Sequence, residues 1–313
     1  MKRFIAFTLL LLTVPFTSTL VHAVTLTFST LDYPGAVNTY AQGISGDMIV
    51  GYYYDGKTYQ GFSYDGNTWT TLTYPDNTNV NNRTFPTGIS GNTITGYYNS
   101  ISGGKGFLYD GKTWTTLSYP SSRHTYIYDI SGNNMVGYAF GDAIDNAFFY
   151  DGITWRDLSF PGAHDSTIIP TGVSGNTIVG TYEENVKGKT VGFMYDGKTV
   201  TVLNYPGALW TDPSGISEKY IVGEYSDGSQ SHGFLYDGTT WTSFDYPDTL
   251  PYASATDIDG NTIIGLYSDA TGTHGFTATL SGETPPIPEP STGLLLGLGL
   301  SIAAVIRRKL KGK

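Results

Sequence analysis

The chain has 313 residues, of which 40 are glycine and 25 are tyrosine, and only 14% are charged. This composition is typical of short β-strands joined by tight turns, and the length suits one large β domain or two small ones. There is no cysteine, which excludes a disulfide framework, a thiolate metal site and a cysteine nucleophile.

The charge is unevenly distributed along the chain. Of the 17 basic residues, two precede residue 24 and five follow residue 306, while two of the 27 acidic residues lie beyond residue 281. The segment between therefore carries ten basic and 25 acidic residues. Such a surface repels phosphate backbones, so we expect no nucleic-acid partner. Solubility outside the cell and weak binding of divalent cations are two interpretations of this excess.

The first 23 residues have the pattern of a secretory signal peptide. Lys2 and Arg3 precede an apolar run over residues 4–14, and Val21-His22-Ala23 offers a cleavage site before Val24. The run is shorter than the ~20 apolar residues of a spanning helix. We therefore expect removal after Ala23, with a retained signal anchor as the alternative.

The C-terminal end has the pattern of an anchor. Residues 282–292 are rich in proline and are expected to form an extended linker. Residues 293–306 are apolar or small, and a basic tail starting at Arg307 and Arg308 follows. A helix over this run would span roughly 21 Å, short of the ~30 Å hydrocarbon core. We expect a short hydrophobic helix within residues 293–313, with the basic end on the cytoplasmic side.

Three elements of this tail stand in a specific order: Pro288-Glu289-Pro290, the apolar segment, and the arginine-rich end. In this order they resemble the PEP-CTERM sorting signal of Gram-negative bacteria. The resemblance implies that the secretion machinery and an exosortase are partners. It also implies a tether in the inner membrane before processing, then a place at the cell surface or outside the cell. An ordinary tail anchor, in which Pro-Glu-Pro is only linker, is the alternative.

A unit of ~43 residues recurs six times in the body of the chain. One signature starts as GISGDMIVGYY at Gly43 and returns from Gly88, Asp129, Gly172, Gly215 and Asp257. A second signature, an aromatic strand followed by Asp-Gly and another strand, starts at Gly61, Gly106, Ala147, Gly192 and Gly233.

Each copy divides into four short strands, a to d. Gly-Asn and Asp-Gly are strong hairpin turns, and strand d ends at a proline, which cannot donate to a ladder. Four short strands per repeat of this length are typical of a propeller blade. We therefore predict an all-β fold, a six-bladed β-propeller over residues 24–281.

The two ends of the repeat region predict how the ring closes. The sixth copy stops after its strand c over residues 275–279, and residues 26–33 have the pattern of a strand d without the three strands that should precede it. Together they would complete one blade and cover the last sheet edge. An open stack of β units is the alternative, but such an array needs polar caps, and the sequence shows none.

The repeat resembles the HAF family of extracellular repeats, whose strand c is similar to His-Gly-Phe-Leu-Tyr-Asp-Gly. That motif stands here at residues 232–238, and His274-Gly275-Phe276 begins another copy. The resemblance covers most of residues 35–280 and implies an exported protein, with no activity attached.

The sequence offers no catalytic constellation. The repeated aspartates lie at one hairpin turn, where turn chemistry explains them: Asp65, Asp110, Asp151, Asp196 and Asp237. The tryptophans that open strand d are expected to pack between blades. The histidines lack metal-ligand spacing, and no unrepeated cluster of carboxylates is evident. We predict a non-catalytic protein.

The loops joining strands d to a and b to c vary between copies and lie on one face of a propeller, where binding loops usually sit. Aromatic residues stand in or beside them: Tyr40, Phe85, Tyr126, Trp210 and Tyr252. We expect this face to bind extracellular polysaccharide (glycans) or surface proteins, with loop drift without function as the alternative. A secreted polysaccharide hydrolase or lyase on the same scaffold is the second function class.

Strand a is the innermost strand of a blade, so its residues should line the central channel. A polar ring is expected from Gln42, Thr87, Tyr128, Thr171, Ser214 and Thr256. Glycine follows in four copies because the axis is crowded, while Asp129 and Asp257 take that place in the third and sixth. These carboxylates could hold one weakly bound calcium ion or cap backbone N–H groups. No other cofactor is expected.

Overall fold

The computed structural model describes residues 24–75, 83–141, 144–160, 163, 165–184, 189–247 and 252–281. The predicted signal peptide with Ala23, the linker over 282–292 and the hydrophobic segment over 293–313 lie outside the described residues, as do Pro288, Glu289, Pro290, Arg307 and Arg308. Val24 is described and is 41% exposed. Within the described part, no helix is long and apolar enough to cross a membrane.

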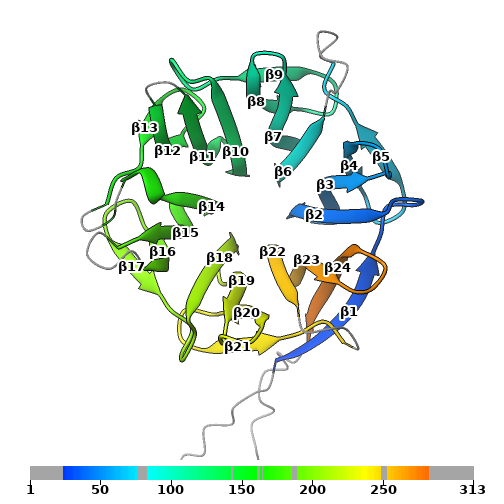
Figure 1. Cartoon of the computed structure of the whole chain (residues 1–313), viewed down its shortest axis with the longest axis vertical. Coiled ribbons are helices and arrows are strands. Elements are labelled where there is room, and N and C mark those ends of the chain that lie inside the picture. Colours follow the sequence, from blue (N-terminus) through cyan, green and yellow to red (C-terminus); the bar gives the residue numbers. More distant parts are fainter. Residues whose placement is uncertain are drawn as a thin grey trace, which may run out of the picture. The chain divides into compact units, whose positions relative to one another are not determined.

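The described residues form 24 strands in six four-stranded antiparallel blades around a central channel (Figure 1). Blade 1 contains β2 (Asn38–Ser45), β3 (Met48–Tyr54), β4 (Tyr59–Tyr64) and β5 (Trp69–Leu72). Blade 2 contains β6 (Thr84–Ser90), β7 (Thr93–Ser100), β8 (Gly103–Tyr109) and β9 (Trp114–Leu117). Blade 3 contains β10 (His124–Ser131), β11 (Asn134–Gly141), β12 (Ile144–Tyr150) and β13 (Trp155–Asp157).

The second half of the ring repeats this plan. A 3-10 turn (Asp165–Thr167) precedes blade 4, which contains β14 (Ile169–Ser174), β15 (Thr177–Glu183), β16 (Thr190–Tyr195) and β17 (Val200–Leu203). Blade 5 contains β18 (Trp210–Ile216), β19 (Ile221–Ser226), β20 (Ser231–Tyr236) and β21 (Trp241–Phe244). Blade 6 contains β22 (Ala253–Asp259), β23 (Thr262–Ser268), β24 (Thr273–Ser281) and β1 (Thr25–Leu31).

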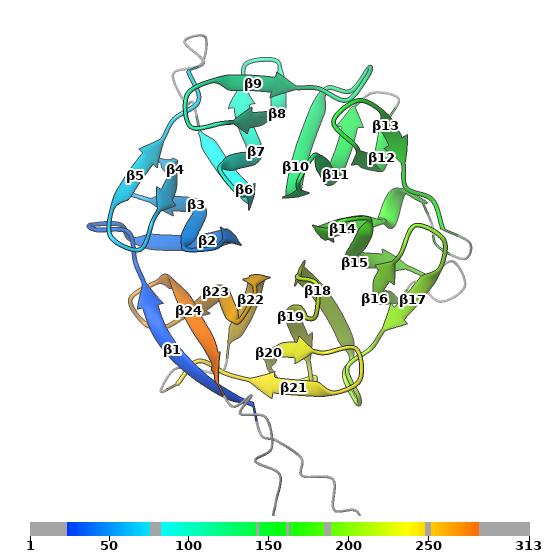
Figure 2. The ribbon, with the colours of Figure 1, turned by 180° about the vertical axis from the view of Figure 1, so that it is seen from behind.

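Blade 6 closes the ring. Its strand order is β22-β23-β24-β1, so the first strand of the propeller completes the last sheet (Figure 2). Phe28 of β1 lies against Phe276 of β24 with ring centroids 5.6 Å apart, and Leu31 is only 6% exposed. The prediction of a six-bladed ring closed by the N-terminal strand is confirmed.

The c–d turns show why the repeated aspartates recur. Asp65 accepts hydrogen bonds at Oδ1 from the backbone N–H groups of Asn67 and Thr68, at 2.9 and 2.7 Å. Gly66 between them has a φ of 90°, in the left-handed region that glycine adopts without steric cost. The equivalent bonds form in the other copies. The predicted turn role of these residues is confirmed.

The core consists of one repeated aromatic arrangement. Strand c of every blade contributes a fully buried phenylalanine: Phe62, Phe107, Phe148, Phe193, Phe234 and Phe276. Trp69 packs edge-on against Phe62 in its own blade, at 5.0 Å, and against Tyr33 at the end of blade 6, at 5.3 Å. The tryptophans therefore pack at blade junctions, as predicted. Each fully buried phenylalanine stabilises the fold by roughly 1.5–3 kcal/mol.

Candidate functional site

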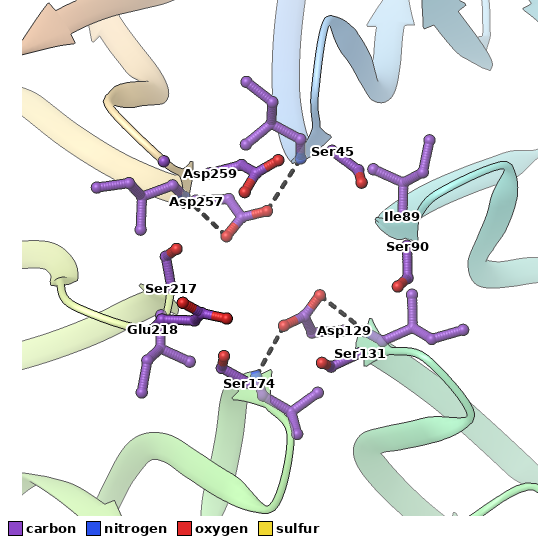
Figure 3. Close-up of a pocket in the computed structure, with 16 residues that line it drawn as sticks. Ser45, Ile89, Ser90, Asp129, Ser131, Ser174, Ser217, Glu218, Asp257 and Asp259 are labelled. Atoms are coloured by element: carbon purple, nitrogen blue, oxygen red, sulfur yellow. Dashed lines mark hydrogen bonds between the residues drawn. The ribbon is translucent and has the colours of Figure 1, made fainter.

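A pocket of about 280 Å³ lies where the strand-a termini meet, and we call it the serine-lined pocket (Figure 3). Three of its serines link consecutive blades, because the hydroxyl oxygen of each accepts a hydrogen bond from a glycine N–H of the following blade. The oxygens of Ser45, Ser90 and Ser131 lie 2.9–3.0 Å from those nitrogens. Asp259 replaces serine in blade 6 and accepts from Gly46 N–H at 2.6 Å.

Asp129 and Asp257 point into the same pocket from blades on opposite sides of the channel (Figure 3). Each carboxyl accepts two backbone N–H groups, one in its own blade and one in the next. For Asp129 the donors are Ile130 and Val173, both at 2.7 Å. For Asp257 they are Ile258 at 2.8 Å and Ile44 at 2.9 Å. The interpretation that each aspartate caps backbone N–H groups is confirmed.

The electrostatics of these two residues follow from their burial. Burial raises the pKa of Asp129 to about 7, against the opposing effect of its two N–H donors. Burial also raises the pKa of Asp257 well above its usual range, and the charge of Asp129 adds to this. In the part of the chain that the structure describes, no three His, Asp or Glu residues form a group suited to a metal ion. Calcium binding here stays a prediction.

The expected polar ring of strand a takes part in contacts between blades. The hydroxyls of Thr87, Thr171 and Thr256 donate to backbone carbonyls of the following blade at 2.6–2.9 Å. The glycine ring is crowded as predicted, since a Cβ on Gly43 would lie 2.9 Å from the Cα of Gly88. This end of the channel is therefore mainly a structural junction.

The variation between blades concentrates at one register position of strands a and b. One cross-strand pair per blade occupies it, and we call these twelve residues the variable ring: Tyr40–Tyr52, Phe85–Tyr97, Tyr126–Tyr138, Ile169–Thr181, Asp212–Glu224 and Ser254–Leu266. The pairs are aromatic in blades 1–3, acidic in blade 5, and neither in blades 4 and 6.

The aromatic members form a continuous run of rings across three blades. We define the aromatic arc as Tyr40, Tyr52, Tyr59, Phe85, Tyr97 and Tyr126. Successive centroids along it lie 4.4–5.1 Å apart, from Tyr40 through Tyr52, Phe85 and Tyr97 to Tyr126. Burial raises the pKa of Tyr52 to about 12. The arc therefore presents neutral, partly exposed rings.

The acidic pair stands in blade 5, across the channel from blade 2 (Figure 2). Asp212 and Glu224 line a pocket of about 400 Å³, with Leu209, Trp210 and Lys189. Burial raises the pKa of Asp212 to about 7, and the charge of Glu224 contributes. Burial also raises the pKa of Glu224, although a hydrogen bond from Ser254 opposes this.

One oxygen of each acid, Oδ1 of Asp212 and Oε2 of Glu224, is buried without a hydrogen-bond partner. A buried carboxylate oxygen without a partner is costly. Among the described residues, the one other buried side-chain N or O atom without a partner is Nε of Arg83. Sequence reasoning found no unrepeated carboxylate cluster, yet the fold brings these two residues side by side. The detectable signal was Glu224 in the place that Tyr52 and Tyr97 occupy after the repeated glycine.

Three of the five predicted binding residues belong to the variable ring, and the other two lie beside it. Tyr40, Phe85 and Tyr126 lie in the aromatic arc, and Trp210 lines the acidic pocket. Tyr252 is 39% exposed; burial and the charges of Glu224 and Tyr40 raise its pKa. Tyr252 is thus within electrostatic reach of both parts.

Comparisons with solved structures concern the propeller. The β-propeller domain of the trilobed protease from Pyrococcus furiosus, described as having an open velcro topology, is 10% identical with a TM-score of 0.50, over 79% of this chain and 99% of that domain. Virginiamycin B lyase from Staphylococcus aureus is 13% identical with a TM-score of 0.43, over 83% and 100% of the two chains. TolB from Acinetobacter baumannii is 16% identical with a TM-score of 0.46, over 75% and 65%. The first likeness supports the fold alone, and the other two support no further conclusion.

The family comparison concerns the tail. Residues 286–309 match the PEP-CTERM protein-sorting motif. The motif implies processing by an exosortase, export and sorting to the cell surface. The chain is therefore an exosortase-sorted surface protein with a propeller domain. No curated protein matches the chain.

Proposed function

We propose that this surface protein binds an extracellular polysaccharide at the variable ring and has no catalytic role. The observation that carries the proposal is the aromatic arc, in which rings from three blades follow one another at 4.4–5.1 Å. Aromatic rings offer a large contact area at low conformational cost. A run of partly exposed rings offers a linear polymer a continuous apolar contact surface. The HAF resemblance agrees with such an exported role.

The binding proposal is tested with a panel of soluble oligosaccharides and isothermal titration calorimetry. Tyr40→Ala and Tyr126→Ala should each weaken binding several-fold to about tenfold, the loss expected for one aromatic contact. Tyr64→Ala is the matched control, because Tyr64 is a half-buried strand-c tyrosine that stacks on Trp69, away from the arc. Equal losses in all three variants, or no binding by the parent, would contradict the proposal.

The cellular part of the proposal concerns the predicted sorting residues. We propose that an exosortase cleaves the tail after the inner membrane has been reached, and that the propeller then acts at the surface. Replacing Pro288, Glu289 and Pro290 by alanine should leave a longer protein in the inner-membrane fraction, measured by fractionation and intact mass. An unchanged mature mass would leave only a plain tail anchor.

A second candidate function is cleavage of polysaccharide, either by hydrolysis or by the elimination reaction of a lyase. The observation in its favour is the unrepeated pair Asp212 and Glu224, since two neighbouring carboxyl groups whose pKa values are raised by burial could act as acid and base. Its test is the release of new reducing or unsaturated ends from the bound polymer. If the parent forms such products and Asp212→Asn does not, the function of the site is catalysis and not binding alone.

A further inference from the structure

The described part of the chain gives the acidic pair no positively charged partner. Among the residues that the structure describes, no Lys, Arg or His forms an ion pair with Asp212 or Glu224. Lys189 lines the same pocket, but its side chain is exposed at the rim. One oxygen of each carboxyl is buried and accepts no hydrogen bond. The described lining of the pocket therefore holds two carboxyl groups and one exposed lysine.

The surroundings of the pair define the cation that would fit. Trp210 and the 62% exposed Leu209 give the pocket an apolar wall, and an aromatic ring attracts a cation over its face. Calcium and magnesium ions prefer six or more oxygen ligands, and the described residues offer no group of three carboxylates or histidines for a metal ion. An ammonium group on a carbon skeleton suits both the acidic pair and the apolar wall, because the group donates three hydrogen bonds and its skeleton brings apolar surface.

Two further observations connect that cation to a sugar polymer. Asp212 and Glu224 occupy the same ring of positions as the aromatic arc, and Tyr252 is within electrostatic reach of both Glu224 and Tyr40. The propeller body also carries 25 acidic against ten basic residues, so its field attracts a polycation and repels a polyanion.

We propose that Asp212 and Glu224 select a polysaccharide with free amino groups, by pairing their carboxylates with the ammonium group of a hexosamine unit. This inference rests on the proposed polysaccharide binding and names the substrate class of that same site. The ammonium supplies the positive charge that the two carboxyl groups lack among the described residues. An N-acetylated unit would bring no charge and would leave the pair uncompensated.

The test compares three oligosaccharides of equal length with the full-length protein: an oligomer of glucosamine, one of N-acetylglucosamine, and one of glucose. The glucosamine oligomer should bind at least tenfold more tightly than the other two, the ratio expected from hydrogen bonds to charged groups. Asp212→Asn and Glu224→Gln should each remove this preference, so that the glucosamine oligomer binds no more tightly than the neutral oligomers. Both variants remove an uncompensated buried charge, so they should melt no lower than the parent.

Two matched variants separate local pairing from overall charge. Glu183→Gln removes the same charge from an exposed position at the end of β15 and should keep the preference. Lys189→Gln removes the competing cation at the rim and should strengthen glucosamine binding. Affinity should also rise with pH as the pair ionises, until the amino groups of the ligand lose their protons.

The outcomes distinguish this inference from the function on which it rests. If all three oligomers bind equally, or the acidic variants keep the preference, the inference is overturned and polysaccharide binding stands. If none of the oligomers binds, both are overturned. If the glucosamine oligomer is cleaved, the pair is catalytic and the inference is likewise overturned.

Discussion

Substituting Leu31 of the closing strand measures how much the packing of β1 contributes to the free energy of unfolding of the propeller. Leu31 is 6% exposed and packs in a cluster with Ile44, Tyr53 and Phe62 of blade 1. Leu72 ends strand d of blade 1 in the equivalent way, is 4% exposed, and packs in the cluster of blade 2. The two leucines thus have the same environment, but only Leu31 belongs to a strand joined to its blade across the chain ends.

We expect Leu31→Ala and Leu72→Ala to lower the free energy of unfolding by the same amount. Each change removes a buried side chain and leaves a cavity, which typically costs about 2–5 kcal/mol. If β1 is an integral strand, the two losses should agree within about 1 kcal/mol, because both strands unfold together with the rest.

The measurement is urea denaturation of both variants and the parent, followed by tryptophan fluorescence and by far-UV circular dichroism. The two probes should give coincident transitions, and the slopes against urea should match those of the parent. A loss below about 1 kcal/mol for Leu31→Ala beside a full loss for Leu72→Ala would refute the reasoning. It would mean that β1 detaches before the propeller unfolds.

Three further predictions follow from the junctions between blades and from the closure of blade 6. Burial raises the pKa of Asp129 to about 7 and that of Asp257 well above its usual range. The contribution of these two groups to the free energy of unfolding is therefore complete below pH about 4 and is lost as the pH rises to about 7. Chemical denaturation at several pH values should show this decrease of the free energy of unfolding with pH, and Asp129→Asn should make the decrease smaller. Gly215→Ala should lower the melting temperature clearly, because its Cβ would lie 2.5 Å from the Cα of Asp257, and an unchanged value would contradict the crowded axis. Burial lowers the pKa of His274, but its bonds to Asp32 and a second aspartate outweigh this effect, so the pKa of His274 is raised. The difference in melting temperature between the parent and His274→Gln should therefore shrink as the pH rises through about 6.5 and above. A difference that stays constant with pH would exclude a charged pair of His274 and Asp32.

The repeated features were predictable from the sequence because they depend on neighbouring residues. The Asp65 turn needs only the following residues, and the closing strand over 25–31 is recognisable by its match to other copies of strand d. The caps made by Asp129 and Asp257 were foreseen as one of two alternatives. Their second partners, in the next blade, depend on the geometry of the ring.

The acidic pair was not predictable in the same way. Asp212 and Glu224 are twelve residues apart, and they meet only because they are register partners in blade 5. A register shift between Pro213 and Gly215 lies between Asp212 and the recognisable end of strand a. One extra residue reverses which face every later side chain occupies, so counting from the repeated Gly-Ile motif assigns Asp212 to the wrong face.

The place of β24 within blade 6 has a mechanical consequence. The chain leaves the propeller at Ser281, the last residue of β24, and the sorting motif over 286–309 follows. β24 lies between β1 and β23 rather than at a sheet edge. Fluid drag on a domain held by this end would load β24, and extracting that strand would require both rows of hydrogen bonds to break. The pairing of β24 with both β1 and β23 thus increases the resistance of the propeller to unfolding under a force applied at its C-terminal end.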